Sequence, residues 1–449
     1  MTLDRREFLV SLGLIGGGAA IGCDTMAPAE RLSAYLEPPR RVVPGVPSHY
    51  ATVCRACPAG CGVLVETRDG RPIKLEGNPQ HPVNRGALCA RGQAAVQGLY
   101  ARSRATAPLL REGGEPRRVG WERAIAHVGG ALASARSIGV LTGLESGSFE
   151  DLLDDLERRF PRVSRAAHEP LSLASLARAS QLVFGVEEVP RVDLRDVDHV
   201  VSFGADLLDT WMSPVELSRA FAERHGFDGG RRLQLDYAGP RRNLTGAAAD
   251  RFFPLAPSRV SRAVLALARA LYEKRRTSIS GGEAAMVEAM LARLDPDPAE
   301  GPLPAEVVDG MASRLAAARR GLVVFGGADV VGPDATAAHA AALLATFLAG
   351  GVGSALRYGE DLALDKVSPE TVVADLIDAA ADGTLDALLV VGANPAYTLP
   401  GGARVAEKLA AAPLVVHLTH ELDETAAAAD AVLPIHHPLE SWGDRSEER

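Results

Sequence analysis

The stretch CRACPAGC at residues 54–61, together with ALCARGQ at residues 87–93, decides how the rest of the chain is interpreted. Its cysteines have the spacing C-x2-C-x3-C-x27-C, and they are four of the five cysteines in 449 residues. Three close thiols and one distant thiol are typical of a [4Fe–4S] cluster, in which each iron takes one thiolate. We therefore predict that Cys54, Cys57, Cys61 and Cys89 are cluster ligands.

Two other kinds of site compete with a cluster. Structural zinc sites usually combine two short C-x2–4-C units, whereas this chain has three close cysteines and one distant one. Disulfides are an option for an exported protein, but three thiols in one short stretch are too crowded for two unstrained bridges. The glycines of PAGCG favour the cluster, because they let the backbone turn tightly and present N–H groups to sulfur.

The composition is that of an ordinary globular protein, with 47% hydrophobic and 23% charged residues. The net charge is −9 and no basic stripe is present, which argues against a nucleic-acid partner. No internal apolar run reaches the roughly 18 residues that a membrane-spanning helix needs.

The N-terminus predicts an export signal over residues 1–23, because a charged start precedes a short apolar run and small residues. Arg5 and Arg6, followed by Phe-Leu, resemble the twin-arginine (Tat) signal. The sequence AIGC resembles a lipoprotein cleavage site, which would make Cys23 a lipidated residue; the alternative is a plain Tat signal. A lipid anchor would hold the protein at the periplasmic face of the inner membrane.

Beyond the signal, residues 24–48 are rich in proline and predict an extended tether. Residues 49–105 form the cysteine domain, with a β-hairpin expected at Asp69-Gly70. Six apolar runs that end in Gly, Asp or Asn then alternate with helical patterns, which predicts α/β domains with doubly wound (Rossmann-like) parallel sheets. We place one domain at 106–255, with a helical continuation over 256–314, and a second at 315–449.

Residues 54–100, from CRACPAGC to the end of ALCARGQAAVQGLY, closely resemble the N-terminal cluster domain of the molybdopterin oxidoreductase superfamily. Further similarity lies in VDHVVSFGADLLDTW, LDALLVVGANPAYTLP and LDETAAAADAVLPIHHPLESWGD. The resemblance covers nearly all of residues 40–444. It is strongest to the Tat-exported branch, which includes polysulfide-reductase-like enzymes and the large iron–sulfur subunit of alternative complex III.

The resemblance implies roles for several residues. Arg91 occupies the position of a cation between cluster and pterin. Two loops would contact the dinucleotides of a molybdenum bis-molybdopterin guanine dinucleotide cofactor, and their residues are Gly204 and Asp206 in one, and Gly392, Asn394 and Pro395 in the other. The segment 236–245 and Asp250 resemble the stretch at the nucleotide end.

The chain also departs from this family. No cysteine follows Cys89, whereas active members usually supply a Cys, selenocysteine, Ser or Asp to molybdenum from the first α/β domain. That region offers serines, His168 and Glu169 in no recognisable pattern, so the catalytic residues stay unassigned. The sequence ends inside a motif that relatives continue into a C-terminal β-rich domain, which we expect to be missing. We therefore expect that the pterin has been lost.

Together these features predict a membrane-associated periplasmic electron-transfer or oxidoreductase subunit with one [4Fe–4S] cluster, in a quinone-linked respiratory complex. The expected partners are a ferredoxin-like iron–sulfur subunit together with an integral-membrane quinone subunit, and cytochrome c is a further candidate. One alternative is a molybdenum-dependent reductase completed by another polypeptide. The other is a non-catalytic scaffold subunit.

Overall fold

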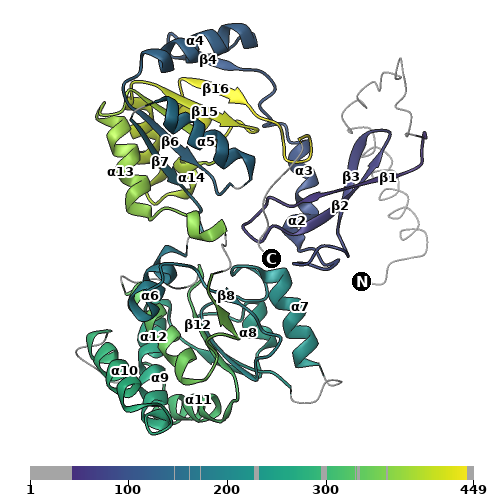
Figure 1. The fold of residues 1–449 in the computed structure, drawn as a ribbon. Coiled ribbons are helices and arrows are strands. Elements are labelled where there is room, and N and C mark those ends of the chain that lie inside the picture. The colour runs from purple at the N-terminus through teal and green to yellow at the C-terminus, as the bar shows by residue number, and fades with distance from the viewer. Residues whose placement is uncertain are drawn as a thin grey trace, which may run out of the picture. The chain divides into compact units, whose positions relative to one another are not determined.

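The computed structural model describes residues 43–441 except 146, 161, 172, 227–231, 295–300, 329, 331–333 and 360–362 (Figure 1). The predicted signal with Arg5, Arg6 and Cys23, and residues 24–42 of the predicted tether, lie outside the described residues. Within the described part, no helix is long and apolar enough to cross a membrane. Residues 43–48 and Arg68–Gly70 belong to one compact unit and the rest to a second, larger one.

The N-terminal part is β-rich, as the sequence predicts. Strands β1 (Ser48–Val53), β2 (Gly62–Arg68) and β3 (Arg71–Gly77) form a sheet in that order. The hairpin between β2 and β3 is confirmed, and its turn residues Asp69 and Gly70 have φ values of 49° and 77°. These left-handed conformations belong to the tight turns that match the twist of the flanking strands. The short helices α2 (Ala90–Ala94) and α3 (Val96–Leu99) follow.

One α/β domain is built on a seven-stranded sheet with the order β5-β4-β16-β15-β14-β6-β7. Its strands are β4 (Leu109–Glu112), β5 (Glu115–Arg118), β6 (Ile138–Thr142), β7 (Val163–Ala167), β14 (Ala387–Val391), β15 (Val415–Thr419) and β16 (Ala431–Pro434). The five strands from β16 to β7 are parallel, and β4 and β5 add an antiparallel edge. The helices are α4 (Trp121–Ser134), α5 (Ser148–Arg159), α13 (Glu370–Ala381), α14 (Pro395–Thr398), α15 (Gly402–Ala411) and α16 (Glu424–Ala428).

The second α/β domain has the parallel sheet β11-β10-β9-β12. Its strands are β9 (His199–Phe203), β10 (Gln234–Gly239), β11 (Arg251–Pro254) and β12 (Gly321–Phe325), and β8 (Arg191–Val192) pairs separately with β13 (Leu356–Arg357). The helices are α6 (Ala174–Phe184), α7 (Pro214–His225), α8 (Leu244–Ala248), α9 (Val260–Arg275), α10 (Gly281–Leu294), α11 (Ala305–Ala317) and α12 (Ala335–Leu348), with short 3-10 turns η2 (Pro257–Arg259) and η3 (Ala363–Lys366).

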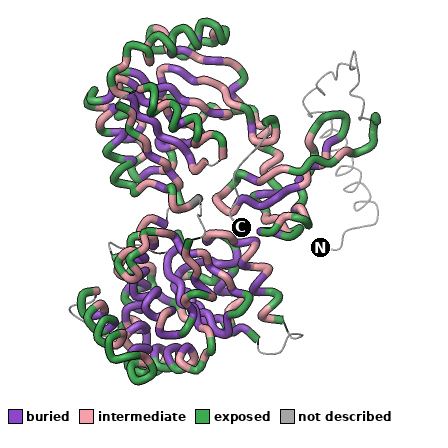
Figure 2. Tube along the Cα trace, in the orientation of Figure 1, coloured by how far each residue is buried: buried purple, intermediate pink, exposed green. Residues whose placement is uncertain are grey.

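Both faces of the second sheet are covered, which explains why its strands are continuous apolar runs. Val201, Phe203 and Phe325 point to one face, into a core shared with α9, α10, α11 and α12. Val200 and Val324 point to the other face, into a core shared with α6 and α7. Buried strands inside exposed outer helices are visible in both α/β domains (Figure 2). The predicted fold class, a β-rich cluster domain followed by doubly wound α/β domains, is therefore confirmed.

The strands are not divided between the domains as predicted. Strands β6 and β7 pair with β14 rather than with β9, and β12 pairs with β9 rather than with β14. The second domain is thus inserted between β7 and β14, and the predicted consecutive domains 106–255 and 315–449 mix strands of both sheets. Buried parallel strands are all similar apolar runs, so their sequences do not specify which run is the neighbour.

A structural unit is repeated in the two sheets. The succession β9–α7–β10–α8–β11 has a counterpart in β14–α15–β15–α16–β16. In the first copy the Asp250 carboxylate accepts a hydrogen bond from the Leu235 N–H at 2.8 Å, and in the second Asp430 does the same for Val415 at 2.8 Å. The acceptor lies 15 residues after the donor in both copies. The two domains therefore bring equivalent loops to the carboxyl ends of their strands.

We predict that His339 makes the protein less stable in acid. Its side chain is buried in α12, with its ring at 4.9 Å and 80° to that of Phe325, and burial lowers its pKa to about 3. The unfolded chain binds a proton near pH 6.5 and the folded chain does not, so this contribution to stability is lost as pH falls from about 6.5 towards 3.

The measurement is the free energy of unfolding at pH 7 and pH 5 for the wild type and His339→Leu. The difference between the two pH values should be smaller in the variant by about 2 kcal/mol, because 1.5 pH units below the unfolded pKa are worth that much. The other histidines are common to both proteins and cancel in the comparison. An identical pH dependence in the two proteins would show that His339 is not a buried neutral group.

Candidate cluster site and adjoining cavity

Three of the four cysteines predicted as ligands lie in or against one small apolar core. Cys54 and Cys61 are buried in it with Val63, Val65 and Leu75, and Cys89 packs against it. The Cys54 N–H donates to the Cys61 carbonyl at 2.8 Å, which joins the two ends of the CRACPAGC loop. All four described cysteines carry thiols rather than disulfides. Burial of this kind excludes water from a cluster and is one of the factors that set its reduction potential.

The fourth cysteine begins a helix. Cys89 is the N-cap of α2, and its Sγ accepts a hydrogen bond from the Gly92 N–H at 3.4 Å. Gly92 permits this close turn, because a Cβ at this position would lie 2.4 Å from the Leu88 side chain. An N–H directed at sulfur stabilises a thiolate, so this end of the site is prepared for a negatively charged ligand.

These features fit a [4Fe–4S] cluster: four thiols, an apolar enclosure and an N–H donor to sulfur. Among the described residues, no group of three or more His, Cys, Asp or Glu side chains could hold a single metal ion. A [4Fe–4S] cluster does not need three ligands around a single ion, because each thiolate binds a different iron. Cys54, Cys57, Cys61 and Cys89 as the ligand set stays a prediction.

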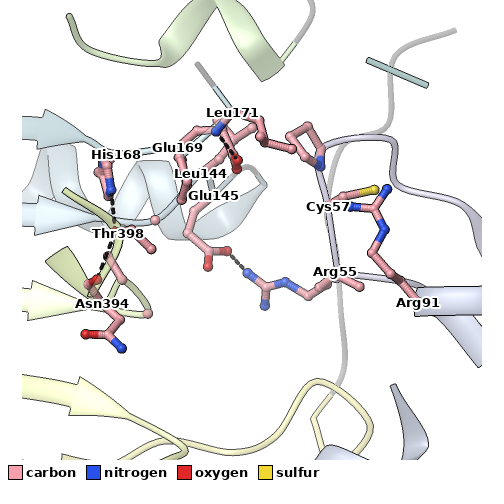
Figure 3. Close-up of a pocket in the computed structure, with 16 residues that line it drawn as sticks. Arg55, Cys57, Arg91, Leu144, Glu145, His168, Glu169, Leu171, Asn394 and Thr398 are labelled. Atoms are coloured by element: carbon pink, nitrogen blue, oxygen red, sulfur yellow. Dashed lines mark hydrogen bonds and ion pairs between the residues drawn. The ribbon is translucent and has the colours of Figure 1, made fainter. Parts of the chain in front are cut away.

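A cavity of about 320 Å³ adjoins Cys57 (Figure 3). It lies at the carboxyl ends of β6, β7 and β14, and the chain leaves β6 towards β7 but leaves β14 in the opposite direction, towards β15. Such a switch point between strands is where open α/β sheets bind ligands. The charged and polar side chains that line it are those of Arg55, Cys57, Arg91, Glu145, His168, Glu169, Asn394 and Thr398.

Several predicted residues therefore meet at this cavity. Arg91 is exposed there, and its Nη2 donates to the Asp209 carbonyl at 3.1 Å. His168 and Gly392 also line the cavity, as do Glu169 and Asn394. Pro395 is the first residue of α14, next to these lining residues.

The side chains of the cavity are largely engaged with one another. Arg55 forms an ion pair with Glu145, which joins the cysteine loop to the end of β6. His168 Nε2 lies 2.7 Å from the Thr398 hydroxyl, and burial lowers the His168 pKa. A Glu169 carboxylate oxygen accepts the N–H of Leu171 at 3.1 Å. His168 is thus a neutral group hydrogen-bonded to its neighbour at pH 7.

The sequence analysis did not assign Arg55, Glu145 or Thr398 to the site. Arg55 directly follows the first cysteine of the cluster motif, and Glu145 follows the apolar run SIGVLTG at its polar end. The position of Glu145 carries a signal, since residues just after parallel strands face the ligand edge of the sheet. Thr398 had no such signal, because it is the last residue of a four-residue helix.

At the corresponding loop of the second sheet, the residues after the strand are in contact with other side chains of the same domain. Gly204, at the end of β9, has φ of 75°, and a Cβ built there would lie 2.3 Å from the Val330 side chain. Asp206 is 7% exposed, and its Oδ1 accepts from the Thr245 N–H at 3.0 Å and the Thr245 hydroxyl at 2.5 Å. The Leu208 N–H donates to the same hydroxyl at 3.0 Å.

Asn394 has the equivalent position in the first sheet and the equivalent contacts. Its Oδ1 accepts from the Thr425 hydroxyl at 2.8 Å, and its Nδ2 donates to Glu424 at 2.7 Å. The Ala396 N–H donates to the Thr425 hydroxyl at 3.2 Å. Asp206 and Asn394, predicted to contact pterin dinucleotides, both tie a strand end to the neighbouring short helix.

The segment predicted at the nucleotide end is also engaged internally. Asp236 is fully buried in β10, where its carboxylate is bound by Arg314 at 2.6 Å, Arg251 at 3.1 Å and His199 at 3.3 Å. Burial alone would raise the Asp236 pKa, but the bonds and charges of His199 and Arg314 outweigh it and lower the pKa. Asp236 thus binds basic side chains inside the domain, whereas Asp250 is exposed and accepts the N–H of Leu235 in β10.

Comparison with known proteins identifies the family. Residues 48–101 match the model of the molybdopterin oxidoreductase Fe4S4 domain. The chain is 30% identical over 473 aligned positions to a protein of Nitratidesulfovibrio vulgaris named menaquinone reductase, molybdopterin-binding-like subunit, and the match covers 99% of this chain and 67% of that protein. The chain belongs to the molybdopterin oxidoreductase family.

Other members of the molybdopterin oxidoreductase family match more distantly. A nitrate reductase of Symbiobacterium thermophilum is 26% identical over 57% of this chain, and a sulfite dehydrogenase of Allochromatium vinosum is 27% identical over 50%. The matches span 34% and 24% of those proteins. The acetylene hydratase structure from Pelobacter acetylenicus superposes with a TM-score of 0.65 at 16% identity, over 87% of this chain and 63% of the other, which shows the shared fold.

The described residues do not fit the molybdenum cofactor that many members of the molybdopterin oxidoreductase family carry. Asp206 and Asn394 use their side chains inside the chain, and Val330 lies against Gly204. The cavity of about 320 Å³ is at the lower end of sites for one small molecule, whereas the cofactor contains two dinucleotides.

We predict that Thr245→Val destabilises the protein by about 3 kcal/mol. The substitution removes a hydrogen bond to a buried carboxylate and leaves the Leu208 N–H without this acceptor. Thr425→Val is the matched control, since it removes the same contacts around the neutral side chain of Asn394. Its cost should be smaller, about 1–2 kcal/mol. Chemical denaturation measures both; a smaller effect for Thr245→Val than for Thr425→Val would contradict the structural role of Asp206.

Proposed function

We propose that this protein is an electron-transfer subunit of a quinone-linked respiratory complex, with one [4Fe–4S] cluster on a molybdopterin-oxidoreductase scaffold that binds no pterin. The observation that carries the proposal is the contrast between the two parts of the site. Three of the four predicted ligand cysteines lie in or against an apolar core and Cys57 lines the adjoining cavity, while Asp206 and Asn394 are engaged within the chain. The relative named as a menaquinone reductase subunit supports the link to quinone.

Cys54, Cys57, Cys61 and Cys89 would hold the cluster, which when bound supplies one-electron transfer. The chain's own residues prepare the site for that task. Buried Cys54 and Cys61 keep water out. Arg91 lines the same cavity as Cys57. Its positive charge would stabilise the additional negative charge of the reduced cluster. Cys57, half-buried at the cavity, lies where an electron can enter or leave.

The proposal extends to location and partners. The Tat-like signal with Arg5 and Arg6, and the lipoprotein-like Cys23, support export and anchoring at the periplasmic face of the inner membrane. Electrons would then pass between two partners, a ferredoxin-like iron–sulfur protein and an integral-membrane quinone subunit, with cytochrome c as another candidate.

The first test is metal analysis of anaerobically purified protein, which should contain about four irons per chain and no molybdenum. Cys57→Ala should abolish the EPR signal of the reduced cluster, because one iron loses its thiolate. Cys23→Ser is the matched control, since Cys23 lies outside the predicted ligand set, and it should keep iron and signal. Molybdenum with pterin would instead establish the reductase alternative, and absence of iron would leave a scaffold.

The second test concerns export. Replacing both Arg5 and Arg6 with lysine should block appearance in the periplasm, because the twin-arginine pair is what the Tat pathway recognises. In the otherwise unchanged protein, Cys23→Ser should release the exported chain from the membrane into the soluble periplasmic fraction. Cell fractionation and immunoblotting measure both. Normal periplasmic appearance of the double lysine variant would refute the Tat assignment.

A further inference from the structure

Asn84 is fully buried in the segment that joins β3 to α2, between the two stretches of chain that carry the cysteines. Its side-chain amide binds both backbone groups of Gly62, the residue after Cys61. The Asn84 Oδ1 accepts from the Gly62 N–H at 2.9 Å, and Nδ2 donates to the Gly62 carbonyl at 2.8 Å. The side chain thus pairs with this residue as the backbone of a neighbouring strand would.

The same asparagine also binds Ala87, two positions before Cys89. Its Nδ2 donates to the Ala87 carbonyl at 2.6 Å, and the Ala87 N–H donates to the Asn84 carbonyl at 2.9 Å. On the other side, the Cys54 N–H donates to the Cys61 carbonyl at 2.8 Å. Hydrogen bonds therefore link the chain at Cys54 and Cys61 to the segment that leads into Cys89.

The two segments also approach each other closely. A Cβ at Gly62 would lie 2.3 Å from the His81 Cγ, and a Cβ at Gly77 would lie 2.4 Å from the Ala87 carbonyl oxygen. Only glycine allows a backbone to come this near. The segment that carries Asn84 is therefore packed directly on the start of β2 and the end of β3.

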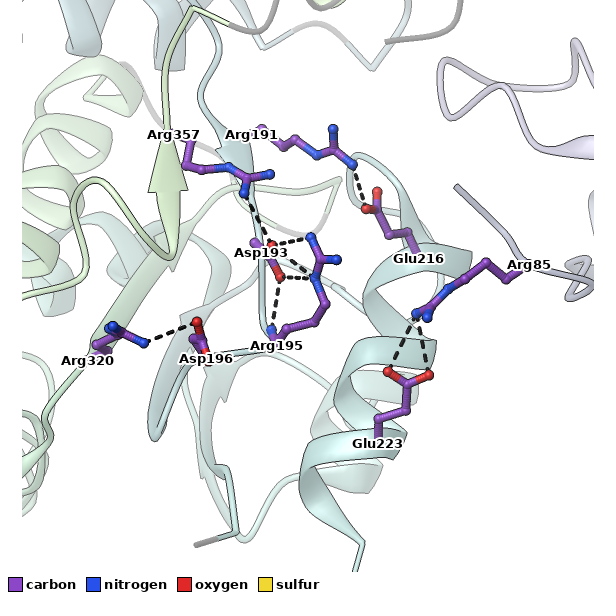
Figure 4. Close-up of polar contacts among 9 residues, drawn as sticks. All are labelled: Arg85, Arg191, Asp193, Arg195, Asp196, Glu216, Glu223, Arg320 and Arg357. Carbon is purple, nitrogen blue, oxygen red and sulfur yellow. Dashed lines mark hydrogen bonds and ion pairs between the residues drawn. The ribbon is translucent and has the colours of Figure 1, made fainter. Parts of the chain in front are cut away.

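The residue after Asn84 ties this segment to α7. The Arg85 Nη2 lies 3.4 Å from a carboxylate oxygen of Glu223 (Figure 4), and the Arg85 carbonyl accepts from the Arg219 Nη1 at 2.8 Å. Val215, also in α7, is buried in the apolar core of the cysteine domain. Helix α7 thus supports the Asn84 segment from the second α/β domain.

An asparagine side chain is well suited to this position. Its amide has one carbonyl acceptor and two N–H donors, and three backbone groups bind them here. Aspartate would lack both donors, and leucine, of similar size, would lack the acceptor as well. Removing the amide would deprive the Gly62 N–H and the Ala87 carbonyl of this partner, which is unfavourable in a buried place.

We infer that Asn84 is a positioning residue for the cluster, which holds the segments of Cys61 and Cys89 together so that both can bind one [4Fe–4S] cluster. The inference rests on the proposed function, because these cysteines are its predicted ligands. The two cysteines are separated by 27 residues, so contacts between their segments must bring them together. Residues around the ligands orient them and tune the metal site, although they do not bind it.

The test compares anaerobically purified full chains of the wild type and Asn84→Leu. Hydrogen–deuterium exchange, followed by peptide mass spectrometry, should be about tenfold faster in the variant over residues 61–67 and 84–89, because buried hydrogen bonds are lost. The variant should also lose iron to a chelator about tenfold faster. The EPR spectrum of its reduced cluster should change, since a ligand segment is no longer held in place.

Asn78→Leu is the matched control, an asparagine of the same segment. The Asn78 Oδ1 accepts the Gln80 N–H at 3.0 Å, within its own turn, so this variant should exchange and retain iron like the wild type. Thermal unfolding shows whether each variant is folded. If leucine at position 84 prevents folding, Asn84→Ala replaces it with the same expected effects.

Equal exchange rates in Asn84→Leu and the wild type would overturn the inference, whether or not the chain binds iron. An unchanged EPR spectrum and rate of iron loss in the variant would overturn it as well. A wild type that holds no iron would refute the proposed cluster, and the exchange rates alone would then decide whether Asn84 holds the two segments together.

Discussion

The arrangement of both α/β domains depends on a hydrogen bond between the end of one strand and the short helix beside it. Thr245 binds Asp206 after β9, and Thr425 binds Asn394 after β14. Each threonine is fully buried, and its hydroxyl also accepts a backbone N–H of the loop. The side chains of Asp206 and Asn394 and the N–H groups of Leu208 and Ala396 therefore have hydrogen-bond partners. Unpaired buried polar groups are costly, and these bonds therefore hold the loops at the carboxyl edges of the sheets.

The same bonds determine what the edges can bind. The side chains of Asp206 and Asn394 at these edges are hydrogen-bonded to threonines of their own chain. In the second sheet, Val330 also lies against Gly204. In the first sheet a cavity stays open beside Cys57, but Arg55 and Glu145 form an ion pair within it. The loops at these strand ends are thus held by contacts within the chain.

The cysteine domain is organised around burial rather than around the loops of the sheets. Cys54 and Cys61 share an apolar core with β2 and β3, so the hairpin that carries no ligand is nonetheless what encloses the ligand positions.

The sequence by itself determined the local features. The cysteine spacing predicted the cluster domain, Asp69-Gly70 predicted the hairpin, and the apolar runs predicted buried parallel strands, because each of these signals lies within a few consecutive residues. It also named Arg91, Gly392 and Asn394 as candidates, and the structure places all three at one cavity. Only the tertiary structure decided which strands are neighbours. Strand β6 pairs with β14, although a whole domain is inserted between them in sequence. The apolar runs resemble one another, so their sequences do not indicate which strands pair. The tertiary structure likewise decided that Asp206 and Asn394 bind the side chains of Thr245 and Thr425, because these threonines are 39 and 31 residues away in sequence.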